Sequence, residues 1–219
     1  MTPGSALEER LREGLAELEI VLLDQQIRQL LSYVELLEKW NKVYNLTAVR
    51  DAAGMLTQHL LDSLSTIGPL RRHTAGRPVR LLDVGSGAGL PGVVIAICCP
   101  SAQVDCVDAV AKKAAFIQQA GATLQLPNLR GLHSRVEHLS GPYDVIASRA
   151  FASLADFVTW SVQALAPAGV WLAMKGKHPD SEIAALPGWA SVFHVEQLRV
   201  PGLEAERCLI WLSRTDGVT

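Results

Sequence analysis

From residue 79 onward, short apolar runs alternate with longer amphipathic stretches. Apolar runs with the length of buried strands cover 79–84, 103–108, 129–133, 143–147 and 169–174. Stretches typical of helices cover 91–98, 111–124, 153–165 and 180–185. Ser153 followed by Asp156 resembles a capping box, which supports a helix start there. This alternation predicts an α/β fold, in which a parallel sheet has helices on both faces.

Two further apolar segments end the chain, Ala190–Leu198 and Arg207–Leu212. The residues between them, including Val200-Pro201-Gly202, leave no room for a helical crossover. Because parallel neighbours need such a crossover, we expect the two segments to pair as an antiparallel hairpin at the end of the sheet.

The pattern of residues 5–70 is helical instead. Leu23, Ile27, Leu30, Val34 and Leu37 recur at spacings of three and four, so they mark one apolar helix face. We expect this face to pack on the main domain. Asp51 is a plausible N-cap for a short helix that follows. The chain is therefore predicted to consist of an N-terminal helical extension, 1–70, and an α/β domain, 71–219.

The composition indicates in which cellular compartment the protein functions. The chain has 219 residues, 49% of them apolar, but its longest uninterrupted apolar run, Val93–Cys99, is too short to span a bilayer. The first residues carry acid and lack the apolar segment of a signal peptide. The four cysteines form no CxxC motif. We expect reduced, buried thiols in a cytoplasmic protein with no membrane partner.

Charge is unevenly distributed. The formal net charge is −2, yet residues 1–38 hold eight acidic and three basic residues, and residues 39–219 hold fourteen acidic and seventeen basic ones. The second part is mildly basic, which permits a polyanionic partner without requiring one.

A glycine-rich loop follows the first predicted strand. Residues 85–92 read Gly-Ser-Gly-Ala-Gly-Leu-Pro-Gly and are followed by an apolar run. A strand, a tight loop and a helix N-terminus in this order point backbone N–H groups at a ligand. The glycines fit two patterns: Gly87–Gly92 fits the G-x-G-x-x-G of dinucleotide-binding proteins, and Gly85–Gly89 fits the G-x-G-x-G of adenosylmethionine-dependent methyltransferases.

Asp83, just before the loop, favours the second pattern. A carboxylate there would repel a pyrophosphate but could attract the ammonium of an amino-acid tail. Gly85, Gly87 and Gly89 are therefore candidate contacts of S-adenosylmethionine. Asp108 ends the second strand about 20 residues past the loop, where an acid holds ribose hydroxyls. This feature serves NAD equally, and Asp108 is alternatively a cap for the next helix.

Two residues after the third strand are further cofactor candidates. Val136 could pack on an adenine face, and Glu137 lies among polar groups that could meet the edge of the ring. The alternative for Glu137 is an ordinary surface charge.

The segment after the fourth strand, Ser148-Arg149-Ala150-Phe151, holds no Asn/Asp-Pro-Pro-aromatic tetrad and no Pro-Cys nucleophile. The six histidines show no clear metal spacing. This suits an acceptor that is already nucleophilic, such as guanine N7, for which transfer needs positioning and no general base. Arg149 is a candidate for positioning cofactor or guanine, with a structural ion pair as its alternative. Phe151 could stack on a flipped base or belong to the core.

The fifth strand delivers Lys175-Gly176-Lys177-His178 to the same edge of the sheet. Lys175 and Lys177 could meet RNA phosphates there, and Lys175 is a second positioning candidate. A second basic patch, Arg71-Arg72-His73 with Arg77 and Arg80, is interpreted mostly as solvated surface.

Several motifs together resemble the RsmG (GidB) family, bacterial methyltransferases that modify guanine N7 in small-subunit ribosomal RNA. The loop alone is unspecific, but the ordered set is highly specific. The motifs that carry the resemblance cover 45–51, 59–64, 83–92, 134–137, 148–154 and 174–176.

The resemblance implies a Rossmann-like class I methyltransferase sheet of seven strands, mostly parallel, with an N-terminal helical extension. It implies S-adenosyl-L-methionine as cofactor and 16S ribosomal RNA, within the small ribosomal subunit or its precursor, as substrate. The cofactor contacts of the family carry over onto Gly85, Leu90, Val136, Glu137 and Arg149.

Three alternatives stay open from sequence: a methyltransferase acting on another RNA, a nicotinamide-dependent oxidoreductase with a Rossmann fold, and a non-enzymatic RNA-docking module. Asp83 and the lack of a convincing Tyr-Lys or His-Asp set disfavour the oxidoreductase.

Overall fold

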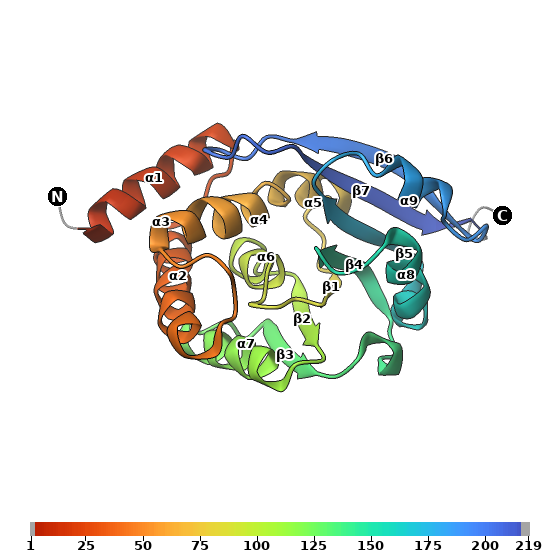
Figure 1. Cartoon of the computed structure of the whole chain (residues 1–219), viewed down its shortest axis with the longest axis horizontal. Helices are drawn as coiled ribbons and strands as arrows, with labels where there is room; N and C mark the ends of the chain where they lie inside the picture. Colours follow the sequence, from red (N-terminus) through yellow and green to blue (C-terminus); the bar gives the residue numbers. More distant parts are fainter. Residues whose placement is uncertain (1–2, 216–219) are drawn as a thin grey trace.

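A computed structural model describes residues 3–215 of the chain. It contains a seven-stranded sheet in the order β3-β2-β1-β4-β5-β7-β6 (Figure 1). The strands are β1 (Arg80–Val84), β2 (Gln103–Asp108), β3 (Leu129–His133), β4 (Tyr143–Arg149), β5 (Leu165–Lys175), β6 (Ala190–Leu198) and β7 (Arg207–Arg214). The first five strands pair in parallel. β7 pairs antiparallel with both β5 and β6, which confirms the predicted fold class and hairpin.

Side chains alternate between the two faces of the sheet, as strand geometry requires. Leu81 faces one apolar core, which the N-terminal helices share. Leu82 faces a second core, to which the helix after β4 contributes. The central strands are apolar on both faces because both faces are covered by helices.

The two layers of helices differ in size (Figure 1). α6 (Gly92–Cys98) and α7 (Ala111–Thr123) contribute to the first core together with the N-terminal helices. α8 (Leu154–Ser161) contributes to the second core, and α9 (Asp180–Ala184) lies against α8. Short 3₁₀ turns, η2 (Val136–His138) and η3 (Val162–Ala164), follow β3 and α8.

The N-terminal part is a series of helices with breaks at 18–23, 45–51 and 65–66. It contains α1 (Pro3–Glu17), α2 (Asp24–Tyr44), α3 (Ala52–Met55), the π-helix η1 (Leu56–Leu61), α4 (Asp62–Leu64) and α5 (Ile67–Thr74). The predicted boundary between 70 and 71 falls inside α5.

The predicted apolar face of α2 is confirmed at Ile27, Leu30, Val34 and Leu37, which are all buried. Leu23 was wrongly included, because it is the N-cap residue of α2 and is 72% exposed. Its backbone N–H donates to the side chain of Gln26, so its place is set by the cap and not by apolar packing.

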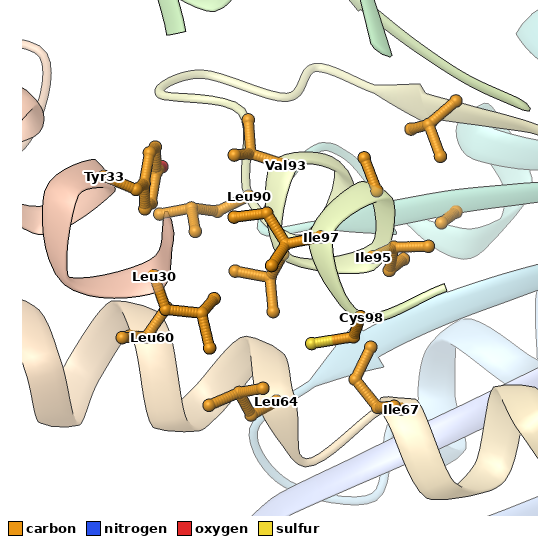
Figure 2. Close-up of a cluster of buried hydrophobic side chains, with 14 of the residues drawn as sticks. Leu30, Tyr33, Leu60, Leu64, Ile67, Leu90, Val93, Ile95, Ile97 and Cys98 are labelled. Carbon is orange, nitrogen blue, oxygen red and sulfur yellow. The ribbon is translucent and has the colours of Figure 1, made fainter. Parts of the chain in front are cut away.

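The N-terminal helices pack directly on α6 (Figure 2). Leu30 of α2, Leu60 of η1 and Leu64 of α4 belong to the same buried cluster as the α6 side chains. Each fully buried aliphatic side chain of this kind contributes about 1.5–3 kcal/mol. The extension is thus fastened to the helix that follows the glycine loop, and it reaches the carboxyl edge of the sheet.

Capping residues in the sequence predicted where two of the helices begin. The carboxylate of Asp51 accepts a hydrogen bond from the Gly54 N–H at 2.7 Å, as its predicted cap role requires. Ser153 accepts one from the Asp156 N–H at 3.1 Å, which confirms the helix start. The helix is shorter than predicted, because 162–164 form a 3₁₀ turn and β5 begins at Leu165. Within residues 3–215 no helix is long and apolar enough to cross a membrane.

Candidate active site

The register of the sheet brings the predicted residues together. Val84 lies opposite Ser148 across β1 and β4, so the residues that follow them, Gly85 and Arg149, lie at the same edge. Arg149 lies opposite Met174 of β5, which brings Lys175 alongside. Because carboxyl ends of parallel strands meet at one edge, the glycine loop, Arg149 and Lys175 form one site.

The glycine loop is held in a left-handed conformation by hydrogen bonds to β2. Gly85, Gly87 and Gly89 have φ values of 63°, 60° and 85°, which glycine adopts at little cost. The Gly87 N–H donates to Oδ2 of Asp108 at 3.0 Å. Oδ1 of Asp108 accepts from the Val110 N–H at 2.8 Å, ahead of α7. Asp108 therefore fastens the loop. Its alternative role as a helix cap is not confirmed, because the N-cap residue of α7 is Val110 and that end of the helix has no side-chain cap.

A buried tyrosine supports the loop from the side of the extension. The Tyr33 hydroxyl of α2 donates to the Ala88 carbonyl at 2.7 Å, and Tyr33 is fully buried. The extension thus positions the loop through a hydrogen bond as well as through apolar packing.

Asp83 lies beneath the loop and lines neither of the two cavities that flank it. It is fully buried, and its Oδ2 accepts a hydrogen bond from the Gly92 N–H at 2.8 Å at the start of α6. Burial raises the pKa of Asp83 to about 7. This geometry assigns Asp83 to the loop–helix junction, so the sequence-based expectation that it attracts an ammonium is replaced by a structural role.

Two cavities open on either side of Gly85 and Ala150. The β2-side cavity, of about 430 Å³, is lined by Asp108, Val136 and Glu137 among others. The β5-side cavity, of about 500 Å³, is lined by Gly87, Leu90, Arg149 and Lys175 among others. Because Gly85 and Ala150 line both, the two cavities adjoin at the glycine loop.

Aromatic rings form one wall of the β2-side cavity. Phe151 is half-buried and lies against Gly85 so closely that a Cβ there would come within 2.2 Å of its ring. Trp160 of α8, 38% exposed, meets Phe151 edge to face at 5.8 Å. Both line this cavity and not the β5-side one. Phe151 therefore lies on the side of Asp108 and Val136.

Val136 and Glu137 differ in exposure. Val136 is buried in the second core and also lines the β2-side cavity. The Glu137 carboxylate is exposed and accepts a hydrogen bond from Arg135 at 2.8 Å, which lowers the pKa of Glu137. The β2-side cavity thus has an apolar surface at Val136 and a charged group beside it at Glu137. These are the features that the sequence analysis expected of the two residues.

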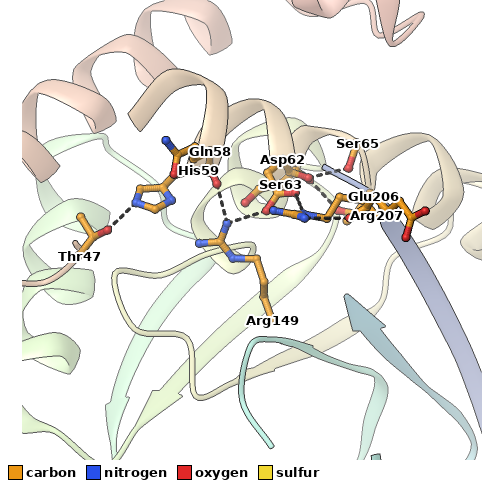
Figure 3. A network of polar contacts seen from close by, with 10 residues as sticks. Thr47, Gln58, His59, Asp62, Ser63, Ser65, Arg149, Glu206 and Arg207 are labelled. Carbon is orange, nitrogen blue, oxygen red and sulfur yellow. Dashed lines mark hydrogen bonds and ion pairs between the residues drawn. The ribbon is translucent and has the colours of Figure 1, made fainter. Parts of the chain in front are cut away.

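An acidic residue of the extension joins two arginines in the β5-side cavity (Figure 3). Oδ2 of Asp62 accepts from Arg149 at 2.9 Å, and Oδ1 accepts from Nε of Arg207 at 2.8 Å. The Asp62 side chain is 3% exposed, against 19% for Arg149 and 26% for Arg207. The arginines neutralise a buried carboxylate and keep part of their surface in the cavity.

The π-helix η1 directs polar groups into this cavity. Arg149 also donates to the Gln58 carbonyl at 3.2 Å. His59 Nε2 lies 2.6 Å from the Thr47 hydroxyl, and its Nδ1 is buried without a hydrogen-bond partner. Burial and the nearby Arg149 cation lower the pKa of His59. π-helical turns often occur at functional sites, and here one carries two residues that line the cavity, Gln58 and His59.

The remaining predicted residues have mixed placements. Lys175 lines the β5-side cavity, but its Nζ donates to Glu182 at 2.8 Å and to the Ala152 carbonyl at 2.9 Å. Lys177 is exposed just beyond the edge of the sheet. Gly89 is buried, and a Cβ there would come within 2.5 Å of Val93, so its role is in loop packing and it lines neither cavity.

Sequence reasoning missed the roles of Tyr33, Asp62 and Arg207. His59 and Asp62 belong to the motif 59–64, which carried the resemblance without assigning them a task. Arg207 opens the last strand as an isolated arginine, and no local pattern distinguishes it. Within residues 3–215, no group of three or more His, Cys, Asp or Glu side chains could hold a metal ion.

This arrangement can bind an extended ligand across the glycine loop, with one part in each cavity. The Gly87 position faces open space, since a Cβ there meets only the Gly85 carbonyl at 4.0 Å. The β5-side cavity offers guanidinium donors and no carboxylate that is free of an ion pair among its lining residues. Such a site suits positioning of an electron-rich acceptor rather than proton abstraction.

Comparisons with known proteins agree with this geometry. The profile of the family described as rRNA small subunit methyltransferase G matches residues 26–210. The chain is 66% identical over 217 residues to "Ribosomal RNA small subunit methyltransferase G" of Acidovorax ebreus, covering 95% of this chain and 96% of the relative. It is 64% identical over 219 residues to the protein of the same name from Albidiferax ferrireducens, covering 95% and 98%.

Among solved structures, a similar fold occurs in the 1,6-didemethyltoxoflavin-N1-methyltransferase of Burkholderia thailandensis, which was determined with bound S-adenosylhomocysteine. The TM-score is 0.56 at 16% identity, covering 84% of this chain and 90% of that one. At this identity the likeness concerns the fold, which is that of Rossmann-like methyltransferases.

Proposed function

Because the chain belongs to the rRNA small subunit methyltransferase G family, we propose that it transfers a methyl group from S-adenosyl-L-methionine to N7 of a specific guanine in 16S ribosomal RNA. The observation that carries this proposal is the pair of adjoining cavities at the glycine loop, one suited to a nucleoside and the other lined by arginines. The location is the cytoplasm, where small ribosomal subunits are assembled.

The residues at the loop fit the cofactor. Asp108 keeps its carboxylate at the end of β2, where it can still accept ribose hydroxyls beside the loop N–H. Val136 offers an apolar face for the adenine, and Glu137 lies at its edge. The open space above Gly87 admits the chain that links the nucleoside to the β5-side cavity. When bound, the cofactor supplies an electrophilic methyl group on a sulfonium.

The β5-side cavity is the place for the acceptor base. Guanine N7 has a lone pair and no proton, so its methylation needs in-line positioning and no base. Asp62 has both oxygens engaged by arginines. His59 has one nitrogen paired with Thr47 and the other buried. The cavity therefore provides no free base, which matches this acceptor.

Arg149 and Arg207 are the groups that orient ligands there. A guanidinium is the natural donor to the O6/N7 edge of guanine and also to a carboxylate. Asp62 accepts hydrogen bonds from both Arg149 and Arg207. Arg149 also lies beside Gly85, so it is placed to contact both the cofactor tail and the base. Lys175, which lines the acceptor cavity, and Lys177 remain candidates for RNA contact. Phe151 lines the cofactor side instead, so this arrangement favours contact with the cofactor over stacking on the acceptor base.

The RNA is best presented within the small subunit or its precursor. The chain has a formal net charge of −2, which is far from the basic character of proteins that bind free RNA on their own. Ribosomal proteins or already folded RNA then contribute part of the surface to which the protein binds.

Ligand-induced stabilisation and methyl transfer test the proposal. S-adenosylhomocysteine should raise the melting temperature of the purified protein, whereas NAD should not. Gly87→Asp should abolish the shift, because its side chain brings bulk and charge next to Asp108. Labelled methyl from S-adenosylmethionine should appear in 16S RNA of small subunits. Stabilisation by NAD alone, or no transfer to any RNA, would refute the proposal.

A further inference from the structure

A cluster of three rings lies outside both cavities of the site. The His73 ring of α5 stacks on Trp211 of β7 with centroids 4.5 Å apart and an interplanar angle of 29°. Phe193 of β6 lies 6.4 Å from each of these rings. Together with Pro69, Arg72, His194 and Glu196 they line a third cavity, of about 380 Å³. We refer to it as the β6 slot.

Phe193 is unusual for its place in the sheet. Its side chain is 51% exposed on β6, an edge strand of the sheet. An exposed apolar surface on an edge strand favours unwanted pairing with other chains. The pairing of β6 with β7 is irregular between Val192 and His194, the residues on either side of it. Such irregularities redirect a side chain, and here the redirected side chain is an aromatic ring at the mouth of a cavity.

Two arginines lie near the slot. Arg72 of α5 lines it, and Arg77 lies close enough to His73 to add to the lowering of the His73 pKa by burial. Arg72 pairs with Glu196 yet its side chain is 65% exposed. The lining holds one arginine and one carboxylate, but the exposed guanidinium of Arg72 and the nearby Arg77 leave room for an anionic group beside the rings.

The slot lies at the far end of the helix–strand pair that forms the acceptor cavity. Asp62, just ahead of α5, contacts Arg207 at the start of β7, and His73 near the end of α5 contacts Trp211. Four residues along a strand span about 13 Å. The slot is therefore separate from the acceptor cavity but lies on the same helix and strand.

We infer that the β6 slot binds an unpaired base of the RNA substrate outside the acceptor cavity, with the base stacked on Phe193 and the adjoining phosphate near Arg72. This inference rests on the proposed RNA substrate. Aromatic side chains bind single-stranded bases through stacking, irrespective of base identity, and arginines hold the backbone in register. The slot is then a second anchor, which positions the strand while the acceptor cavity selects the base.

Steady-state methylation of purified small subunits tests the inference. Phe193→Ala should raise the KM for small subunits by about 5- to 150-fold, the range expected for losing one stacked base, with the affinity for S-adenosylhomocysteine unchanged. Phe193→Trp should restore a KM near that of the parent, because a ring is retained. Leu23→Ala, a change at another exposed apolar side chain (72% exposed), should stay within twofold of the parent.

A photoreactive benzoylphenylalanine at position 193 identifies the occupant. Irradiation with small subunits should join the protein to 16S RNA, and the crosslink should vanish after ribonuclease treatment. A KM for Phe193→Ala within twofold of the parent, or a crosslink to a ribosomal protein instead of RNA, would overturn the inference. Either result leaves the proposed function standing, since the parent protein would still transfer a methyl group to 16S RNA.

Discussion

Arg149, at the end of β4, donates a hydrogen bond of 2.9 Å to Asp62, a residue 87 positions earlier in the chain. This contact ties the sheet edge that holds the glycine loop to the N-terminal helices. Asp62 also binds Arg207 of β7. The acceptor cavity is therefore built jointly by the α/β sheet and the extension.

Replacing this carboxylate should impair both folding and activity. Asp62→Asn leaves two arginines without their counter-charge at a site where Asp62 is 3% exposed. We expect the free energy of unfolding to fall by about 3 kcal/mol and methyl transfer to fall at least tenfold. Urea unfolding and a methylation assay measure these effects. Asp180→Asn, at a carboxylate that is 88% exposed, is the control, and equal behaviour of the two variants would contradict the role of Asp62.

Two glycines of the loop should differ in their tolerance of alanine. Gly85→Ala places a Cβ 2.2 Å from the Phe151 ring, whereas Gly87→Ala meets open space. Both pay about 1–2 kcal/mol for the left-handed conformation, so the difference between their stabilities reports the overlap alone. We expect Gly85→Ala to melt at a clearly lower temperature, and Gly85→Ala/Phe151→Ala to recover part of the loss. Equal melting of the two single variants would mean that Phe151 does not contact the loop.

Tyr33 should influence cofactor binding from a distance. Tyr33→Phe removes the hydroxyl that donates to the Ala88 carbonyl and leaves that acceptor unpaired. We expect the free energy of unfolding to fall by about 1–2 kcal/mol, together with weaker binding of S-adenosylhomocysteine in calorimetry because the loop is less firmly held. Tyr44→Phe, at a ring that is 41% exposed, should change neither quantity. Unaltered affinity in Tyr33→Phe would show that the loop keeps its shape without this bond.

Asp83 should make stability depend on pH. Its pKa is raised by burial from 3.8 to about 7, so between these values the folded protein holds a proton that the unfolded chain has released. Stability from this group is present at low pH and is lost as the pH rises towards 7. Asp83→Asn mimics the protonated form, so its stability relative to the parent should increase between pH 5 and pH 8. Parallel stability curves for the two proteins would rule out this titration.

Lys175 can be tested against its own ion-pair partner. Nζ of Lys175 binds Glu182, and Glu182 also accepts from the Leu154 N–H at 2.7 Å. If Lys175 contacts an RNA phosphate, Lys175→Ala should raise the KM for small subunits and reduce its salt dependence by about one ion. Glu182→Gln breaks the same pair without removing the cation, so it should preserve the salt dependence. The same shift in both variants would assign Lys175 a structural role only.

Local patterns predicted most of the fold. Each predicted strand from 79 to 212 is present, because buried strands leave short apolar runs and Gly or Pro marks their ends. The π-helix at 56–61 was not predicted, since its hydrogen bonds depend on packing and leave no periodic signal. Residues 165–168 were likewise not expected in β5, because Leu165 was assigned to the preceding helix and Ala-Pro-Ala lacks the apolar character of a strand.

The candidate site was only partly predictable. The glycine loop, Asp108 and Arg149 could be predicted as site residues because each lies at the carboxyl end of a strand. The rest of the network around Arg149 could not be predicted, because Asp62 and Arg207 lie 145 residues apart in sequence and meet only through the fold. For Asp83 the sequence suggested a different role from the one that the structure shows. Its position before the loop suggested contact with a ligand, whereas its buried carboxylate accepts a hydrogen bond from the N–H at the start of α6.

The most direct test of the account is to map the methylated nucleotide. Small subunits that lack the modification are incubated with the purified protein and S-adenosylmethionine, and N7-methylguanosine is located by borohydride and aniline cleavage of the 16S RNA. The account predicts one new cleavage at a single guanine, absent with Gly87→Asp. No cleavage, or methyl label at another atom or in another RNA, would contradict it.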